Sequence, residues 1–271
     1  MIKDFTFKDR YDINDLLEIM TALRSPGGCP WDAEQDHKSI RKDFIEETYE
    51  AIEAIDNDDP VLLQEELGDV LLQVVFHSEI EREKGVFDFS DVADGICKKL
   101  IERHPHVFGD VRVNGSDEVL VNWDRIKQRT KGQKKQSDSM LSVPKQFPAL
   151  MRAQKIQHKA AKVGFDWDDV SGALERLESE ISELKQAIKN GGAQEQSDEL
   201  GDVLFSAVNV ARFIGAESEK ALSDSTDKFL NRFIIVERLA REAGRDMTDM
   251  TLAELDELWD RAKLEAGTPQ R

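Results

Sequence analysis

The residues of this chain that could do chemistry are carboxylates that occur twice at one spacing. The sequence Glu66-Leu67-Gly68-Asp69-Val70-Leu71 recurs letter for letter at 199–204, and a Glu-x-x-Glu element precedes each copy, at 47–50 and at 180–183. The differences 180 − 47 and 199 − 66 are both 133, so no residue is gained or lost between the two parts. The chain therefore carries a duplicated carboxylate site.

Carboxylates three residues apart lie on one face of a helix, so Glu47 with Glu50, and Glu66 with Asp69, each present two oxygen ligands in one direction. Two such helices packed side by side would make a four-carboxylate cage. Four anions so close together need either raised pKa values or a bound cation. Ligation by oxygen alone selects a hard ion, Mg²⁺ or Mn²⁺. The second copy predicts the same cage from Glu180, Glu183, Glu199 and Asp202.

A glycine stands between the acidic residues of both copies, at Gly68 and Gly201. Acidic pairs alone are weak evidence, because 55 of the 271 residues are Asp or Glu. A glycine inside a helix is disfavoured by about 1 kcal/mol relative to alanine. We therefore expect a neighbouring helix or a ligand to approach each glycine closely. We also expect Val70, Leu71 and Val74 to supply the core beside the carboxylates.

A pair of cations four residues apart is repeated as well. Lys99 and Arg103 match Lys228 and Arg232 at an offset of 129, so the intervening loop is shorter in the second copy. These side chains could face the outer phosphates of a metal-bound ligand, or they could be ordinary surface cations. Because the chain has no Gly-rich phosphate loop of the P-loop kind, phosphates would be held by metal and side chains.

Other metal schemes fit the sequence poorly. A ferritin-like di-iron bundle needs Glu-x-x-His on two helices, and the only example here, at 34–37, lies in a segment that resembles a loop. We expect His104 and His106 to pack in a turn. Cys29 and Cys97 are too few and too far apart for a zinc site or a disulfide framework, so we interpret them as ordinary thiols.

Helical periodicity dominates the chain, which predicts an all-α fold. We expect turn residues at 104–109, a capping box from Thr251 to Glu254 opening the last helix, and helices over 12–23, 39–55, 60–84, 90–103, 116–129, 149–162, 172–189, 195–215 and 217–242. Short connections favour antiparallel neighbours, so each half should be a bundle of about four helices. The polar stretch 131–147 is predicted to link a first domain, 1–130, to a second, 148–271.

Composition limits the partners. The net charge of −18 disfavours polymeric DNA or RNA, whose binding depends on cations that displace counterions from phosphates. A mononucleotide is still compatible, because a bound divalent metal inverts the local field of an acidic site. The sequence shows no signal peptide and no membrane span, so we expect a cytoplasmic protein with no membrane partner.

These motifs resemble the MazG family of nucleoside triphosphate pyrophosphohydrolases. The family signature, Glu-Glu-x-x-Glu followed by Glu-x-x-Asp on paired helices, is matched by 46–50 with 66–69. The resemblance covers nearly the whole chain, including the sequences at 29–32, 104–108 and 163–167, and it is closest to the two-domain bacterial form.

The resemblance implies hydrolysis of nucleoside triphosphates (NTP or dNTP) to monophosphate and pyrophosphate, a nucleotide-pool housekeeping reaction, by a Mg²⁺-dependent homodimer of helical bundles. It implies that the metal ligands are Glu47, Glu50, Glu66, Asp69, Glu180, Glu183, Glu199 and Asp202. The implied catalytic residues are Glu46, Glu47, Glu50, Glu180 and Glu183. Lys228, Arg232 and Trp259 match positions near the nucleotide, and Lys99 with Arg103 would be their first-half equivalents.

One position departs from the family pattern: where the first copy has Glu46, the second has Ser179. If the leading glutamate positions or deprotonates water, the second site would be slowed, whereas an outer role would leave both sites working. The alternative function is therefore a nucleotide-sensing module that binds without turnover in one or both halves. A third hypothesis is a helical scaffold whose acidic residues are simply solvated.

Overall fold

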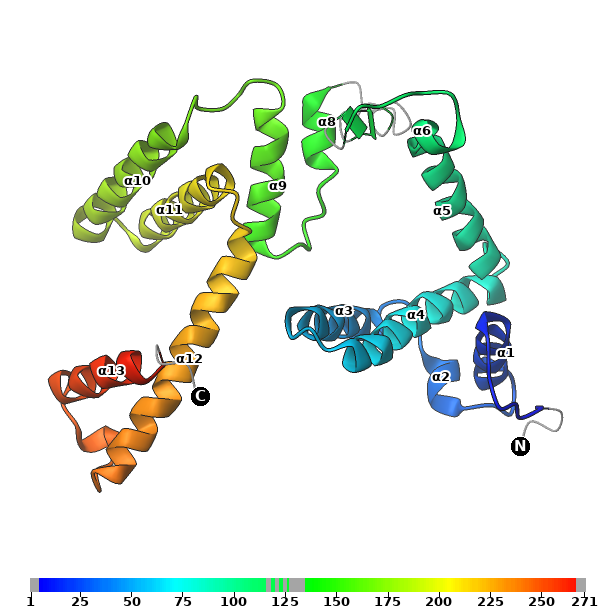
Figure 1. Cartoon of the computed structure of the whole chain (residues 1–271), viewed down its shortest axis with the longest axis horizontal. Helices are drawn as coiled ribbons and strands as arrows, with labels where there is room; N and C mark the ends of the chain where they lie inside the picture. The colour runs from blue at the N-terminus through cyan, green and yellow to red at the C-terminus, as the bar shows by residue number, and fades with distance from the viewer. Residues whose placement is uncertain (1–4, 116–117, 120–121, 124–125, 127–134, 267–271) are drawn as a thin grey trace. The chain divides into compact units, whose positions relative to one another are not determined.

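Two compact units make up the chain, residues 1–127 and 128–271. The computed structural model describes residues 5–115, 118–119, 122–123, 126 and 135–266, and within these it holds helices and no strand (Figure 1). The all-α prediction is confirmed. The predicted helix over 116–129 and the start of the predicted linker, 131–134, lie largely outside the described residues. No helix among those described is long and apolar enough to cross a membrane.

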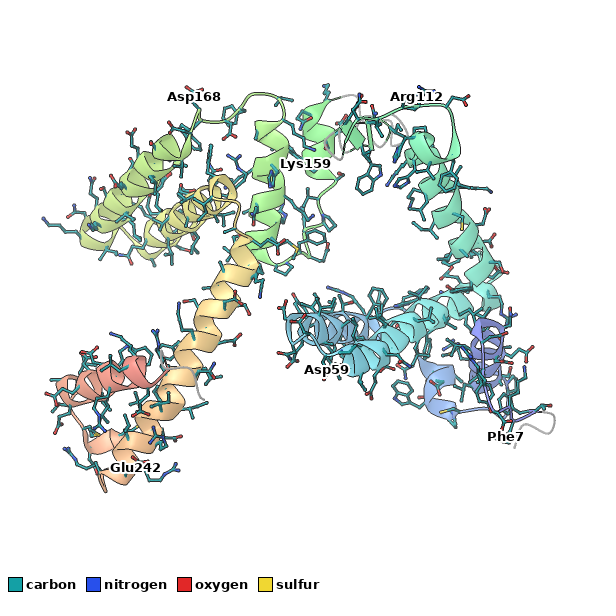
Figure 2. All side chains as sticks on the ribbon, viewed as in Figure 1. Phe7, Asp59, Arg112, Lys159, Asp168 and Glu242 are labelled. Carbon is teal, nitrogen blue, oxygen red and sulfur yellow. The ribbon has the colours of Figure 1, made fainter. Side chains whose placement is uncertain are left out.

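The first unit contains α1 (Ile13–Arg24), α2 (Pro30–Glu34), α3 (Arg41–Asp56), α4 (Pro60–Glu83), α5 (Phe89–Arg103) and α6 (Pro105–Phe108). Local sequence explains several of these boundaries. The Asp12 side chain accepts hydrogen bonds from two amides of the first turn of α1, and Asp59, labelled in Figure 2, does the same for α4. Pro60 stands at the first position of α4, where a missing N–H costs least.

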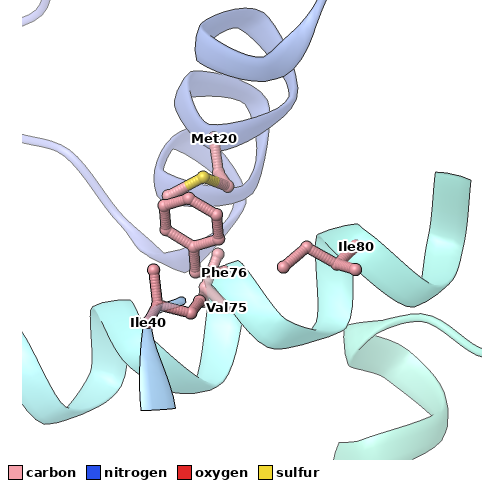
Figure 3. Close-up of a cluster of buried hydrophobic side chains, with 5 residues drawn as sticks. All are labelled: Met20, Ile40, Val75, Phe76 and Ile80. Carbon is pink, nitrogen blue, oxygen red and sulfur yellow. The ribbon is translucent and has the colours of Figure 1, made fainter. Parts of the chain in front are cut away.

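The core of the first unit lies between α1 and the carboxyl-terminal half of α4. Its buried side chains are Met20, Ile40, Val75, Phe76 and Ile80 (Figure 3). Ile40 comes from the segment just before α3 and is 2% exposed. This contact fixes the amino-terminal end of α3 against α4, the two helices that carry the first set of carboxylates.

The second unit contains α8 (Gln136–Leu141), α9 (Ala149–Ala161), α10 (Val170–Asn190), α11 (Ala193–Phe213), α12 (Ser218–Glu242), the 3₁₀ turn η1 (Met247–Asp249) and α13 (Leu252–Ala266). The α8 helix falls within the segment predicted as a linker, and it is tied to α9 because Lys159 Nζ donates to Ser139 Oγ at 2.6 Å. The predicted capping box of α13 is present, since the Glu254 carboxylate accepts from the Thr251 amide at 2.8 Å and the Thr251 hydroxyl accepts from the Glu254 amide.

Each set of carboxylates is carried by a hairpin of two packed helices, α3 with α4 and α10 with α11. The first hairpin turns through Asp58, whose φ of 52° is a left-handed conformation that Asp tolerates better than most residues. The second turns through Gly191 and Gly192, which end α10 and begin α11. Both connections are short, so the paired helices run antiparallel, as predicted.

The prediction that Leu71 belongs to the core is wrong. Leu71 is 38% exposed and Leu67 is 53% exposed, whereas Val70 and Val74 are half-buried. The expected close approach of a helix to the glycines is also absent within the described residues, because a Cβ built on Gly68 or Gly201 would meet no atom within 4 Å. Both differences have one cause: within its own unit, one face of each hairpin is left uncovered by the described residues.

Candidate metal centres

Three carboxylates of the first hairpin converge. Glu47 reaches from α3, and Glu66 and Asp69 reach from α4, so that one oxygen of each lies within 4.8 Å of the others. The three-residue spacing of Glu66 and Asp69 puts both on the α4 face that α3 packs against. We call this trio the first carboxylate group.

Crowding of negative charge changes the acidity of the first carboxylate group. Burial, followed by the charges of Asp69 and Glu50, raises the pKa of Glu47 above its ordinary value. Burial, followed by the charges of Glu50 and Asp69, raises the pKa of Glu66. A bound proton lowers the repulsion among these carboxylates, and a divalent cation would lower it in the same way.

The second hairpin repeats this arrangement with Glu180 from α10 and Glu199 and Asp202 from α11, again within 4.8 Å. We call this trio the second carboxylate group. Glu180 is only 3% exposed. Burial, followed by the charges of Glu183 and Asp202, raises the pKa of Glu199.

The fourth predicted ligand of each cage lies beside its group and is not a member of it. Glu50 lies close enough to Glu47 for its charge to raise the pKa of Glu47. In the second half, the Ser179 hydroxyl donates to Glu183 Oε1 at 2.9 Å. Ser179 is the residue that replaces the leading glutamate, and its contact with Glu183 has no equivalent at Glu46, which is exposed.

Arg176 is a residue of the second site that sequence reasoning missed. Its guanidinium Nη2 contacts Glu180 Oε1 at 2.5 Å, and its Nη1 lies 3.6 Å from Glu183 Oε1. The available signal was its position four residues before Glu180, the spacing at which opposite charges meet on a helix. The aligned position of the first half is Asp43, which carries the opposite charge.

The residues of both groups fit a hard divalent cation. All the donors are carboxylate oxygens, which Mg²⁺ and Mn²⁺ prefer. Oε2 of Glu180 and Oε2 of Glu199 are buried and have no hydrogen-bond partner among the described residues. Buried acceptors are rarely left unpaired, so these atoms point to a ligand.

The predicted nucleotide-binding residues form matching pairs in the two halves. Arg103 lies over the Trp123 ring at 5.9 Å, and Arg232 lies over the Trp259 ring at 6.0 Å. The Nε atoms of both arginines are buried without a partner among the described residues. Lys228 and Arg232 also line one open hollow of about 450 Å³ with Asp224, Asp227, Asn231 and Ala266.

The structure does not join these cations to the carboxylates. No hydrogen bond or ion pair connects Lys99, Arg103, Lys228 or Arg232 to either carboxylate group within the described part of the chain.

Two segments, residues 35–108 and 169–236, match the family model described as the MazG nucleotide pyrophosphohydrolase domain. Together they contain every residue of both carboxylate groups. The chain belongs to the MazG family.

Full-length relatives agree with the MazG assignment. The chain is 45% identical over 249 residues to the nucleoside triphosphate pyrophosphohydrolase/pyrophosphatase MazG of Thermotoga maritima, which spans 92% of this chain and 94% of the relative. It is 43% identical over 256 residues to the nucleoside triphosphate pyrophosphohydrolase of Escherichia coli K12, which spans 93% of this chain and 97% of the relative. A Bacillus subtilis relative, named as uncharacterized protein YabN, is 46% identical over 256 residues that make up 52% of its length.

The first MazG domain also contains a histidine pair that sequence reasoning missed. His37, in the segment between α2 and α3, places its Nδ1 2.7 Å from Nδ1 of His77 on α4, and its Nε2 lies 2.5 Å from Glu81 Oε1. The ring centroids are 5.0 Å apart in nearly parallel planes. The two Nδ1 atoms are within hydrogen-bond distance, so one ring donates and the other accepts, with the roles set by the tautomers.

The other candidate ligands stay outside these centres. His104 Nδ1 lies 2.6 Å from the Leu100 carbonyl oxygen, and its ring is 5.6 Å from that of His106. The predicted turn over 104–109 contains the short helix α6, in which His106 lies. Cys29 and Cys97 are free thiols.

Proposed function

We propose that this chain hydrolyses nucleoside triphosphates, ribo or deoxy, to nucleoside monophosphate and pyrophosphate, with Mg²⁺ held by its carboxylates and Mn²⁺ as an alternative ion. The observation that carries the proposal is the convergence of three carboxylates on each hairpin, with unpartnered buried oxygens in the second group. The names of the Thermotoga maritima and Escherichia coli relatives supply the reaction.

The chain's own residues would divide the work as follows. Glu47, Glu66 and Asp69, or Glu180, Glu199 and Asp202, would hold the ion. When bound, Mg²⁺ supplies neutralisation of phosphate charge and polarisation of the attacking water. Glu46, which is exposed at the start of the motif, or Glu50 would orient that water.

The cations and aromatic rings would hold the nucleotide. Lys228 and Arg232 share one hollow, where they could contact phosphate oxygens. Trp259, with Phe229 at a centroid distance of 5.1 Å, offers a face for a base. Lys99 and Arg103, with Trp123, would be the corresponding set of the first half.

The test is direct. Purified protein is incubated with a panel of NTPs and dNTPs, with and without Mg²⁺, and the nucleotide products and pyrophosphate are separated by chromatography. We expect metal-dependent formation of monophosphate and pyrophosphate in equal amounts. Release of inorganic phosphate and diphosphate, or no turnover of any triphosphate, would contradict the proposal.

We further propose that the protein is a cytoplasmic homodimer that binds neither polymeric nucleic acid nor membranes. Large apolar side chains are exposed along the hairpins, including Ile45, Tyr49, Leu67, Leu200 and Leu204, all more than 45% exposed. Contiguous exposed apolar surface is typical of a protein interface. Light scattering on the eluting protein should give twice the chain mass, and a monomer that keeps full activity would contradict this.

The second candidate function is nucleotide binding without turnover by the second half. The specific observation is that the second half has Arg176 and Ser179 where the first half has the acidic residues Asp43 and Glu46. Calorimetric binding of a triphosphate, with no monophosphate formed when the first carboxylate group is neutralised, would favour this function for the second half.

A further inference from the structure

The two carboxylate groups are built on the same backbone pattern but sit in opposite electrostatic surroundings. At the offset of 133, Arg176 of α10 aligns with Asp43 of α3, and Ser179 aligns with Glu46. The first exchange changes the charge beside the group by two units and the second by one. Both positions lie within one helical turn of the ligand Glu180 or Glu47, where such differences act at short range.

In the second half, a cation already occupies one side of the site. Arg176 Nη2 lies 2.5 Å from Glu180 Oε1, and the Glu180 side chain is only 4% exposed while that of Arg176 is 48% exposed. The guanidinium therefore covers one oxygen of a buried carboxylate. The other oxygen, Oε2, is the buried atom without a partner among the described residues.

Glu183 is held by the same cluster. Its Oε1 accepts from the Ser179 hydroxyl at 2.9 Å and lies 3.6 Å from Arg176 Nη1. These two contacts keep Glu183 next to the second carboxylate group without making it a member. A serine can do this because its hydroxyl donates, whereas a glutamate at this position would repel Glu183.

The first half has no equivalent counterion. Among the described residues, no lysine or arginine forms an ion pair with Glu47, Glu50, Glu66 or Asp69. Asp43, at the position of Arg176, pairs only with the exposed Lys42, at 3.4 Å. The first group is therefore surrounded by carboxylates, and the pKa values of Glu47 and Glu66 are raised accordingly.

We propose that Arg176 is a resident counterion of Glu180 whose positive charge opposes the binding of a divalent cation, and that Ser179 is a positioning residue that keeps Glu183 ready for that cation. This inference rests on the proposed function, since it assumes that both groups bind a divalent ion. Its consequence is an ordered filling: the first site takes its cation at a lower concentration than the second. The second half then responds to divalent-cation levels that already saturate the first.

Direct binding of Mn²⁺ alone, without nucleotide, tests the role of Arg176. The first site is neutralised by E66Q with D69N, and Mn²⁺ binding to the second site is followed by calorimetry and by the loss of the free-ion electron paramagnetic resonance signal. We expect R176Q to tighten Mn²⁺ binding about tenfold, as removal of a like charge at this range would. R176K keeps the cation and should bind as weakly as the parent protein.

K189Q is the matched control, because it removes the same charge from an exposed lysine near the end of α10. It should leave Mn²⁺ affinity unchanged within about twofold, since screening weakens surface charges at that distance. Equal tightening in R176Q and K189Q would reduce the effect to net charge and overturn the role of Arg176.

A reciprocal exchange tests the same idea in the first half. With the second site neutralised by E199Q and D202N, D43R should weaken Mn²⁺ binding to the first site about tenfold. Circular dichroism should show unchanged helix content, because Asp43 and Arg176 are both partly exposed. Unchanged affinity in a folded D43R variant would overturn the proposal.

The positioning role of Ser179 has its own test. S179A should weaken Mn²⁺ binding to the second site about threefold, and S179T, which keeps the hydroxyl, should restore it. S182A is the control, because the Ser182 hydroxyl donates to the Glu178 carbonyl oxygen on the same helix and contacts no ligand. Equal binding by S179A and S179T would contradict the role.

Failure of this inference differs from failure of the proposed function. If both sites bind Mn²⁺ but R176Q and D43R change nothing, the counterion role is wrong and the enzyme proposal stands. If neither site binds Mn²⁺ in any variant and no triphosphate is hydrolysed, the proposed function is wrong, and the inference falls with it.

Discussion

The two hairpins carry the same trio of carboxylates, yet among the described residues only the second trio has an arginine paired with it. In α3 and α4, Glu47 is surrounded by Asp69 and Glu50, and its pKa rises. In α10 and α11, Glu180 meets the guanidinium of Arg176. Duplication preserved the ligand positions, because one missing carboxylate would remove an oxygen from the group. The flanking positions, by contrast, changed charge between the two halves. Under our proposal, these charges set the affinity of each site for a divalent cation while the geometry of the site is kept.

Neutralising the ligands should give the largest effect and shows which half hydrolyses. We expect E66Q/D69N/E199Q/D202N to lose activity by roughly 10³-fold or more, because charge stabilisation in the transition state is lost. Separate measurements of E66Q/D69N and E199Q/D202N then show how much of that loss of activity comes from each half. E65Q/D198N, which neutralises neighbours of the ligands on the same helices, is the control. Full turnover in the quadruple variant would refute the carboxylate mechanism.

Thermal stability in Mg²⁺ should give the next largest effect. A ligand that binds only the native state adds about 2.7 kcal/mol at 100 times its Kd, which corresponds to a rise in Tm of several degrees for domains of this size. At low Mg²⁺, E66Q/D69N should remove more of this rise than E199Q/D202N, because the first site has no competing cation. A Tm that does not change when Mg²⁺ is added would instead favour the scaffold hypothesis.

The pH dependence of the metal-free protein should separate the halves further. The pKa values of Glu47 and Glu66 are raised in the folded state, so the folded protein binds more protons above the ordinary Glu value of 4.5. Stability should therefore fall as the pH rises through that window. With a chelator present, the change in Tm between pH 4.5 and 7 should flatten more in E47Q/E66Q, which removes two carboxylates with raised pKa values, than in E199Q, which removes one.

The histidine pair should give the smallest effect, and only in the first half. Burial, followed by the charge of His37, lowers the pKa of His77 below 6.5. The folded state therefore binds fewer protons than the unfolded chain, and stability is lost as the pH falls below 6.5.

We expect this loss to be about 2 °C in Tm by pH 5.5 and to be smaller in H77Q. The groups that face the pair are Glu81, with Lys84 2.7 Å from it, and Phe44 of α3. Val210 occupies the aligned position of the second half, so V210 variants serve as the negative control. If the Tm of H77Q falls on acidification by as much as that of the parent protein, groups other than this histidine pair cause the fall.

Most helices could be predicted from sequence, because their causes are local. Thr251 caps the helix that it was expected to cap, and Asp12 and Asp59 cap theirs by the same local rule, since a cap depends on residues two or three positions away. The Arg–Trp contacts were not predicted, because 123 − 103 = 20 whereas 259 − 232 = 27, so the two pairs do not share one sequence spacing. Leu71 was assigned wrongly because burial depends on what covers a helix face, and no neighbouring sequence encodes that.

The sequence by itself determined the all-α class, the duplication and the identity of the carboxylates, since periodicity and a constant offset are properties of the chain alone. Only the tertiary structure decided which carboxylates converge. Three residues of each predicted cage meet across a helix pair, whereas Glu50 and Glu183 are not members of these groups. It also decided that Arg176 covers Glu180 and that His37 faces His77. Electrostatic partners depend on distances of a few ångströms between side chains, and these distances exist only after the helices have packed.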